Sequence, residues 1–271
     1  MKQIAPNTYV ERENTNCNLG LIKTSEGIVL VDTPMWPSNA VWWRDIVNAM
    51  GEIRYVINTE EHRDHCANSF FFPGLLITSQ ATRATLAKAP LEPVLESVKR
   101  TDPKGFPLME GFKMRLADIA FTGNLEVHLG NHTFQLFPLP GHSPGGIGVF
   151  VPEERVAFTT DCVFHHVKSW LHEANPEVWL ESLKRIGELD VAAIVGGHGD
   201  VCDKAYLHEQ ADIISQWVDM AKAAIKKGLS EEEAFDQIKV PDPHPKQEGT
   251  PFTEPELNKK IISRLYKLYA G

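Results

Sequence analysis

The densest group of ligand-type side chains lies in residues 58–65, directly after a short apolar stretch that predicts a strand. If this loop is extended, Glu60, His62 and Asp64 point to the same side, because alternate residues share a face. His65 then follows as the chain turns towards the next element. Two imidazoles and two carboxylates in so short a segment suit a divalent cation better than a protein core, since borderline metals accept nitrogen and oxygen ligands.

Three more residues of these types follow predicted strands later in the chain. His142 lies in the Gly/Pro-rich segment 140–146, and His198 lies in the Gly-rich segment 196–200. Asp161 comes at the end of another predicted strand. Ligand-type side chains at strand ends are expected to meet, because loops gather around one mouth of a layered sheet.

The elements that must position these residues predict an α/β layered sheet. Residues 7–33 have the pattern of an antiparallel meander, 38–50 that of an amphipathic helix, and 54–58 that of a short strand. A second half of similar plan contains two hairpins, a helix and a buried strand, in residues 125–139, 147–159, 176–189 and 191–195.

We predict a single domain over residues 1–271, because no linker is long enough to separate two domains. Two regions lie outside the layered plan. Residues 80–124 are helical and loop-rich; they are either a lid over a substrate pocket or a hairpin that only closes the sheet. Residues 204–271 contain two predicted helices, 204–228 and 256–269, joined by a Pro-rich connector. The apolar stripe of the last helix is either core or a contact in a homodimer.

The composition excludes several classes of partner. Hydrophobic residues make up 42% of the 271 residues, and the net charge of −9 argues against nucleic acid or an anionic membrane. A small anionic substrate drawn to a local cation is compatible with that charge. The four cysteines form no CxxC pair, and there is neither a signal-peptide pattern nor a run of ~18 apolar residues. We therefore expect a cytoplasmic protein with reduced thiols and a small-molecule substrate.

The arrangement resembles the metallo-β-lactamase superfamily, whose signature is H-x-H-x-D-H after a strand, followed by a lone His, a lone Asp and a lone His. The resemblance extends from about Asn16 to about Asp200 and includes Asp32, which looks like the family's early strand-end aspartate. It implies a four-layer αβ/βα sandwich. It also implies two divalent metal ions, with zinc expected and iron or manganese as alternatives.

The resemblance further implies a role for each ligand-type residue. His62 and His142, with the residue at 60, would hold the first metal. The second would be held by Asp64, His65 and His198, and Asp161 would bridge the two.

Three other residues are candidates for supporting roles. Asp32 could orient a metal-bound histidine through its other ring nitrogen, or could simply end a strand in a turn. His165 and His166 follow Asp161 and either contact substrate or form a histidine pair on the surface.

The sequence departs from the family pattern at position 60, which is Glu60 instead of His. A carboxylate shifts the first site towards oxygen-rich ligation, which favours iron or manganese more than imidazoles would. With Asp64 and Asp161 it also lowers the charge of the centre, so the metal becomes a weaker Lewis acid. Alternatively, Glu60 turns away and one metal binds tightly. A second departure is Thr160, where the family usually has Gly.

The function implied by the resemblance is hydrolysis of an ester, lactone, thioester, amide or phosphoester by a metal-bound hydroxide, with Asp64 orienting it and taking a proton. An iron-dependent oxidoreductase of the same fold, similar to persulfide dioxygenases, is one alternative. A non-catalytic metal-binding protein is the other. Hydrolysis of β-lactams is not favoured, because a cytoplasmic enzyme would be away from the periplasm.

Overall fold

A computed structural model describes residues 1–13, 15–239, 242–247 and 252–270. The first sheet follows the chain order of its strands. They are β1 (Lys2–Ala5), β2 (Thr8–Glu11), β3 (Leu19–Thr24), β4 (Gly27–Val31), β5 (Ile53–Ile57), β6 (Leu75–Ser79) and β7 (Ile119–Phe121). β1 to β4 are antiparallel, which confirms the predicted meander, and β4 to β7 are parallel.

The second sheet has the order β13-β11-β10-β9-β8 and holds the second half of the chain. Its strands are β8 (Leu125–Leu129), β9 (His132–Pro138), β10 (Ile147–Val151), β11 (Val156–Phe158) and β13 (Ala193–Val195). β11 and β13 are parallel, and the other pairs are antiparallel, so both predicted hairpins are confirmed. Two short strands, β12 (Phe164–His165) and β14 (His198–Gly199), pair separately.

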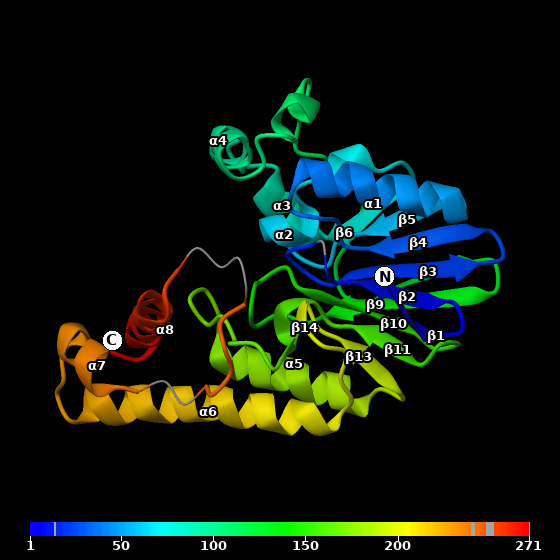
Figure 1. Ribbon diagram of the computed structural model, residues 1–271. Helices are drawn as coiled ribbons and strands as arrows, with labels where there is room; N and C mark the ends of the chain where they lie inside the picture. The colour runs from blue at the N-terminus through cyan, green and yellow to red at the C-terminus, as the bar shows by residue number, and fades with distance from the viewer. Residues whose placement is uncertain (14, 240–241, 248–251, 271) are drawn as a thin grey trace.

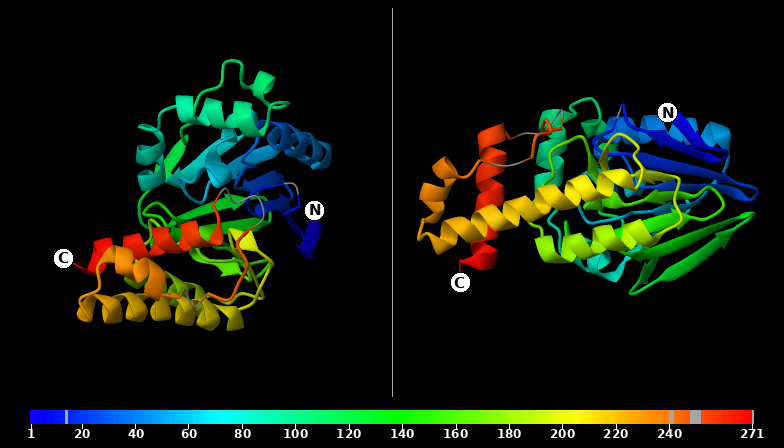
Figure 2. Two further views of the ribbon diagram at one scale, coloured as in Figure 1. Left: turned by 60° about the vertical axis from the view of Figure 1, so that its left-hand side comes forward. Right: turned by 90° about the horizontal axis from the view of Figure 1, so that it is seen from below.

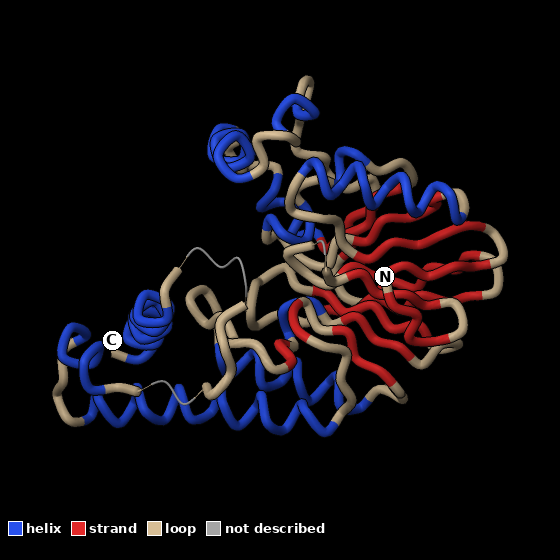
Figure 3. The backbone as a smooth tube through the Cα atoms, in the orientation of Figure 1, coloured by secondary structure: helices blue, strands red, loops and turns tan. Residues whose placement is uncertain are grey.

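Helices cover the outer face of each sheet, as Figures 1 and 3 show. α1 (Pro37–Met50) lies on the first sheet, and α5 (Pro176–Glu188) and α6 (Ala205–Lys226) lie on the second. The remaining helices are α2 (Arg63–Cys66), α3 (Gln80–Leu86), α4 (Glu92–Thr101), α7 (Glu231–Gln237) and α8 (Glu254–Tyr269), with short 3-10 turns η1 (Ser69–Phe71), η2 (Phe106–Met109) and η3 (Thr160–Cys162).

Three layers of apolar side chains hold the four structural layers together. Residues such as Val29 and Val149 fill the space between the two sheets. Trp43 of α1 packs on the outer face of the first sheet, and Trp179 and Trp217 pack under the second. All three tryptophans are almost completely buried, and burying such large side chains is a major source of stability. The predicted four-layer αβ/βα sandwich is confirmed.

Local sequence explains where several helices begin. Pro176 starts α5, and the side chain of Asn175 accepts a hydrogen bond from the backbone N–H of Val178. α8 begins with a capping box between Thr253 and Glu256. Figure 2 shows α6 extending past the sheets, with α7 and α8 packed near its far end. Residues 240–241 and 248–251 of the predicted connector lie outside the described part of the chain.

Parallel pairing brings the ends of distant strands to one edge of the sandwich. Val31 at the end of β4 lies beside Ile57 at the end of β5, and Phe158 of β11 lies beside Val195 of β13. The segments that follow these strands therefore emerge together. A backbone hydrogen bond of 2.8 Å from the N–H of Ile147 to the carbonyl of Thr59 joins the two sheets at this edge.

No helix in the described ranges is long and apolar enough to cross a lipid bilayer.

Candidate metal centre

The loop after β5 bends at residues 60–62 and then enters a helical turn. His62 has extended backbone angles, and Arg63–Cys66 then forms one turn of helix, α2. We expected Asp64 to share a face with Glu60 and His62 because alternate residues of an extended loop point to one side. That reason is wrong, because Asp64 lies in a helical turn. A helical turn, not an extended loop, carries Asp64 and His65 into the same region as Glu60.

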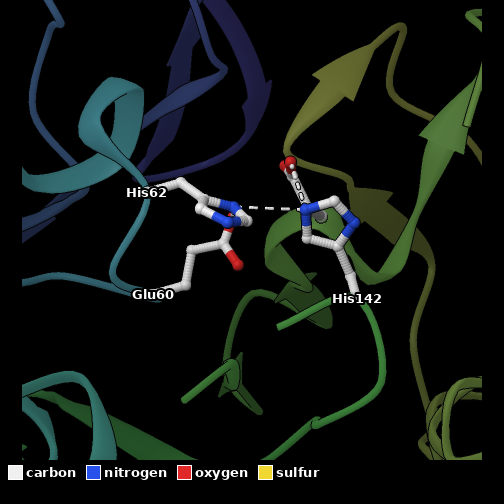
Figure 4. Close-up of side chains that lie close together, drawn as sticks. Glu60, His62 and His142 are labelled. Carbon is white, nitrogen blue, oxygen red and sulfur yellow. Dashed lines mark hydrogen bonds and ion pairs between the residues drawn. The ribbon is translucent and has the colours of Figure 1, made fainter. Parts of the chain in front are cut away.

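A first group of four side chains forms between this loop and the second half of the chain (Figure 4). Nδ1 of His62 lies 3.1 Å from Oε1 of Glu60 and 3.2 Å from Nε2 of His142. The same Nε2 of His142 lies 3.3 Å from Oδ2 of Asp161. Two imidazoles and two carboxylates therefore converge through one atom each, which is the donor set that borderline metals accept.

A second group contains Asp64, His65 and His198. Nε2 of His198 lies 3.4 Å from Oδ2 of Asp64, and Nε2 of His65 lies 3.9 Å from the same oxygen. Oδ1 of Asp161 is 3.1 Å from Nε2 of His65 and 3.2 Å from Nε2 of His198. Asp161 thus presents one oxygen to each group and lies between them.

The protein alone does not satisfy this donor set. Among the described residues, Oε2 of Glu60 is buried without a hydrogen-bond partner, and Nε2 of His65 and Oδ1 of Asp161 lie close together without the geometry of a hydrogen bond. Burial would raise the pKa of Glu60, but the adjacent imidazoles of His62 and His142 bring that pKa to about 2. Buried charge without a partner is costly. The group therefore fits cations better than it fits a closed protein core.

The backbone around Asp161 is shaped to deliver that carboxylate. Thr160 has a φ of 46°, which lies in the left-handed region of the backbone that residues other than Gly and Asn rarely adopt. Gly197 lies directly against Asp161, and a Cβ at position 197 would overlap its Oδ1. The Gly-rich stretch before His198 is therefore needed for close approach, which the sequence alone did not reveal.

The profile of the metallo-beta-lactamase superfamily matches residues 12–198, which include every residue of both groups. The chain belongs to this superfamily. Hydroxyacylglutathione hydrolase of Mesorhizobium japonicum is 29% identical over 109 residues, and the match spans 40% of each chain. Metallo-beta-lactamase type 2 of Elizabethkingia meningoseptica is 23% identical over 216 residues, which cover 76% of this chain and 78% of that protein.

Two solved structures are similar to this chain in fold. A metallo-beta-lactamase family protein of Thermus thermophilus superposes with a TM-score of 0.69 at 14% identity, covering 97% of this chain and 93% of that one. A sec-alkylsulfatase of a Pseudomonas species gives the same TM-score of 0.69 at 14% identity, covering 99% of this chain and 50% of that chain. At these identities the likeness concerns the fold alone.

Carboxylates outside the two groups fix the orientation of two histidines in this member of the superfamily. Asp32 accepts hydrogen bonds of 2.7 Å from the backbone N–H and the hydroxyl of Thr59, and its Oδ2 lies 2.8 Å from Nδ1 of His65. This contact leaves Nε2 of His65 facing the two groups, which together are called the cluster below. Asp32 follows β4 and contacts His65, so an orienting role for Asp32 stays a prediction that these contacts support.

Glu173 makes a corresponding contact to His62, and the sequence analysis missed it. Oε2 of Glu173 lies 3.3 Å from Nε2 of His62, and this hydrogen bond lowers the pKa of Glu173 to about 2. It leaves Nδ1 of His62 facing Glu60. The only signal in the sequence is a carboxylate in the same loop as Trp170 and His172.

His165 and His166 do not lie with the cluster. Their rings stack with 3.9 Å between the ring centroids, and both rings pack against Tyr206 of α6. Neither of them lines the cavity over the cluster. Trp170, His172 and Glu173, further along the same loop, line it instead.

A cavity of about 490 Å³ opens over the cluster, and His62, Asp64, His142, Asp161 and His198 lie in its wall. This volume suits a small molecule. Trp36, Trp170 and Phe252 give it apolar surface, and α4 contributes Ser97, Arg100 and Thr101. Residues 80–124 therefore reach the cavity through α4. A lid formed by this segment remains a prediction.

We expect Asp32→Asn to weaken metal binding about 10- to 100-fold, because the partner that orients His65 is lost. An asparagine cannot accept hydrogen bonds from Thr59 and His65 with both of its side-chain atoms. Competition with a chromogenic chelator measures the affinity. Asp45→Asn, on the exposed face of α1 and paired with Arg44, is the control. Equal affinity in the Asp32 variant and the wild type would remove Asp32 from this role.

We expect Thr160→Gly to raise the free energy of unfolding by about 1 kcal/mol, because glycine adopts a φ of 46° without strain. The hydroxyl of Thr160 is buried without a partner among the described residues, so its loss removes a second penalty. Urea unfolding of the metal-free protein measures the change. Thr160→Ala keeps the Cβ and should gain less; a larger gain in the alanine variant would contradict the strain argument.

Proposed function

We propose that the protein is a hydrolase that uses two divalent metal ions. Glu60, His62 and His142 would hold one ion, and a second set would hold the other: Asp64, His65 and His198. Asp161 would bridge the two ions. The observation that carries the proposal is the position of Asp161, whose two oxygens face the two groups at 3.1 to 3.3 Å.

When bound, such ions supply a nucleophile by lowering the pKa of water from ~15.7 towards ~7, and they polarise the bond to be cleaved. The residues of the chain supply position and proton transfer. Asp64 is the carboxylate of the cluster with the most access to the cavity, with 25% of its side chain exposed against 6% for Asp161. We assign Asp64 the role of orienting the attacking water and accepting its proton.

The hydroxyacylglutathione hydrolases among the relatives support thioesters and related esters as the substrate class. The apolar wall of Trp36, Trp170 and Phe252 supports a substrate with a hydrophobic part next to the cleaved bond. Zinc is the metal we propose first, with iron or manganese as alternatives because of the carboxylate at position 60.

One observation favours an iron-dependent oxidoreductase as the second candidate. Glu60, His62 and His142 are two imidazoles and one carboxylate, the donor set of many non-haem iron oxygenases. In that case one iron would bind, and a persulfide would be the substrate class.

Metal analysis of protein purified without added metal, followed by activity assays, separates these candidates. Two equivalents of zinc with turnover of esters or thioesters supports the hydrolase. About one iron with oxygen consumption on a persulfide supports the oxidoreductase. Bound metal without turnover on either substrate panel would overturn both proposals and favour a non-catalytic metal-binding protein.

A further inference from the structure

Two arginines in the wall of the cavity lack a partner in the part of the chain that the structure describes. Among the described residues, neither Arg63 nor Arg100 makes a hydrogen bond or an ion pair, and both line the cavity over the cluster. The other arginines each contact a carboxylate, an amide or a carbonyl oxygen: Arg12, Arg44, Arg54, Arg83, Arg115, Arg155, Arg185 and Arg264.

Arg63 is held in a costly position. It is the first residue of α2, and its Nε and Nη2 atoms are buried without an acceptor among the residues of the described ranges. A guanidinium is always charged and carries five N–H donors, and the three donors on Nε and Nη2 lack an acceptor among the described residues, which is unfavourable. Because Arg63 also lines the cavity, an oxyanion bound there would accept a charge-assisted hydrogen bond from its guanidinium.

Arg100 approaches the same space from a different part of the fold. It lies in the last turn of α4, next to Ser97 and Thr101, which also line the cavity. Both guanidinium groups carry a positive charge, and both line the same cavity. Two guanidinium groups that repel each other across a cavity are a favourable setting for an anion.

The carboxylates in the same cavity are already engaged. Asp64 and Asp161 belong to the cluster, and Glu173 contacts His62. An anion supplied from outside is therefore the fitting partner for the two arginines. Trp36 also lines this cavity and offers an apolar surface to a ligand.

We propose that Arg63 and Arg100 form a subsite that binds an oxyanion group of the substrate, either a carboxylate or a sulfonate-like group. The hydrophobic part of the substrate would contact Trp36 and Trp170, which line the same cavity. This inference rests on the proposed hydrolase function and narrows its substrate class to anionic esters and thioesters. The subsite reconciles such a substrate with the net charge of −9, because the attraction is local.

The test begins with binding, which does not depend on turnover. Naphthalene-2-sulfonate and its uncharged analogue 2-naphthyl methyl sulfone are titrated into the metal-loaded protein by calorimetry. We expect the sulfonate to bind at least about tenfold more tightly, as charge-assisted hydrogen bonds imply. Arg63→Gln and Arg100→Gln should each remove most of this preference. Arg44→Gln, at the exposed Arg44–Asp45 pair on α1, should keep it.

Activity then compares 4-nitrophenyl hemiglutarate with the uncharged 4-nitrophenyl butyrate. The ratio of kcat/KM for the two esters should fall at least about tenfold in Arg100→Gln, mainly through KM for the anionic ester. Metal content is measured in every variant, because Arg63 lies between two residues of the cluster. Arg100, on a separate helix, therefore decides the outcome if Arg63→Gln loses metal.

The results separate this inference from the proposed function. Equal binding of sulfonate and sulfone by the wild type, or an unchanged preference in Arg100→Gln, overturns the subsite even if both esters are cleaved. Absence of ester turnover in the metal-loaded wild type overturns the hydrolase, while tight sulfonate binding that depends on Arg100 would still establish the subsite.

Discussion

Replacing Asp161 with alanine is expected to abolish turnover, with a loss of at least about 100-fold in kcat/KM. The two oxygens of Asp161 face imidazoles of both groups, so the substitution removes a donor from each half of the centre at once. Loss of an orienting partner alone typically costs 10- to 100-fold in affinity or activity, and loss of a direct ligand should cost more. Ester turnover and metal content of the same preparation measure the effect.

The control for this variant must separate a lost ligand from a lost fold. Asp161 is buried, and Asp161→Ala removes one carboxylate that lies next to three histidine nitrogens. Asp161→Asn keeps the shape of the side chain and should also lose activity, because an amide donates where a ligand oxygen is needed. Asp190→Ala, at an exposed pair with Arg155, should behave as wild type. Full turnover in folded Asp161→Asn would contradict a two-metal centre.

Glu60→Gln is expected to reduce metal content from two equivalents to about one, with the second group still filled. Oε1 of Glu60 lies 3.1 Å from Nδ1 of His62, and Oε2 is buried without a partner among the described residues. A glutamine keeps the size of the side chain but removes the negative charge that attracts the cation. Activity should fall by more than about 100-fold, the upper range for an outer partner.

The neighbouring residue provides a matched control for Glu60. Glu61 has the same side chain, but its Oε2 accepts a 3.0 Å hydrogen bond from Thr82 at α3 instead of facing the cluster. Glu61→Gln should therefore keep both equivalents of metal. Glu60→His, which restores the family pattern, should retain two equivalents and shift the preference towards zinc over iron. Unchanged stoichiometry in Glu60→Gln would remove Glu60 from the centre.

The sequence predicted the elements of the fold well because their signals are local. β-branched runs, a proline at the start of α5 and alternating apolar residues act over a few neighbours, so the meander, both hairpins and α5 follow from them. The ligand-type residues at strand ends could also be predicted, because their positions follow from the same local signals. The parallel pairing of β4 with β5 and of β11 with β13 could not be predicted from local signals, although the order strand, helix, strand predicted an α/β layered sheet.

The sequence was less informative wherever the position of a side chain depends on a distant segment. Alternation failed at Asp64 because α2 replaces the extended loop with a helical turn. His165 and His166 follow Asp161 in sequence, yet they pack against Tyr206 of α6, while Glu173 contacts His62. Nothing near residue 173 in the sequence indicates which distant histidine it would contact.

The sequence by itself determined which side chains could bind metal and that they follow strands, because residue type and short-range patterns are written in consecutive residues. Only the tertiary structure decided that Asp161 lies between two groups, and that Arg63 and Arg100 share a cavity without partners among the described residues. Those facts depend on how two sheets, α4 and the loops between them pack against one another. Such packing is set by many weak contacts between residues far apart in the chain.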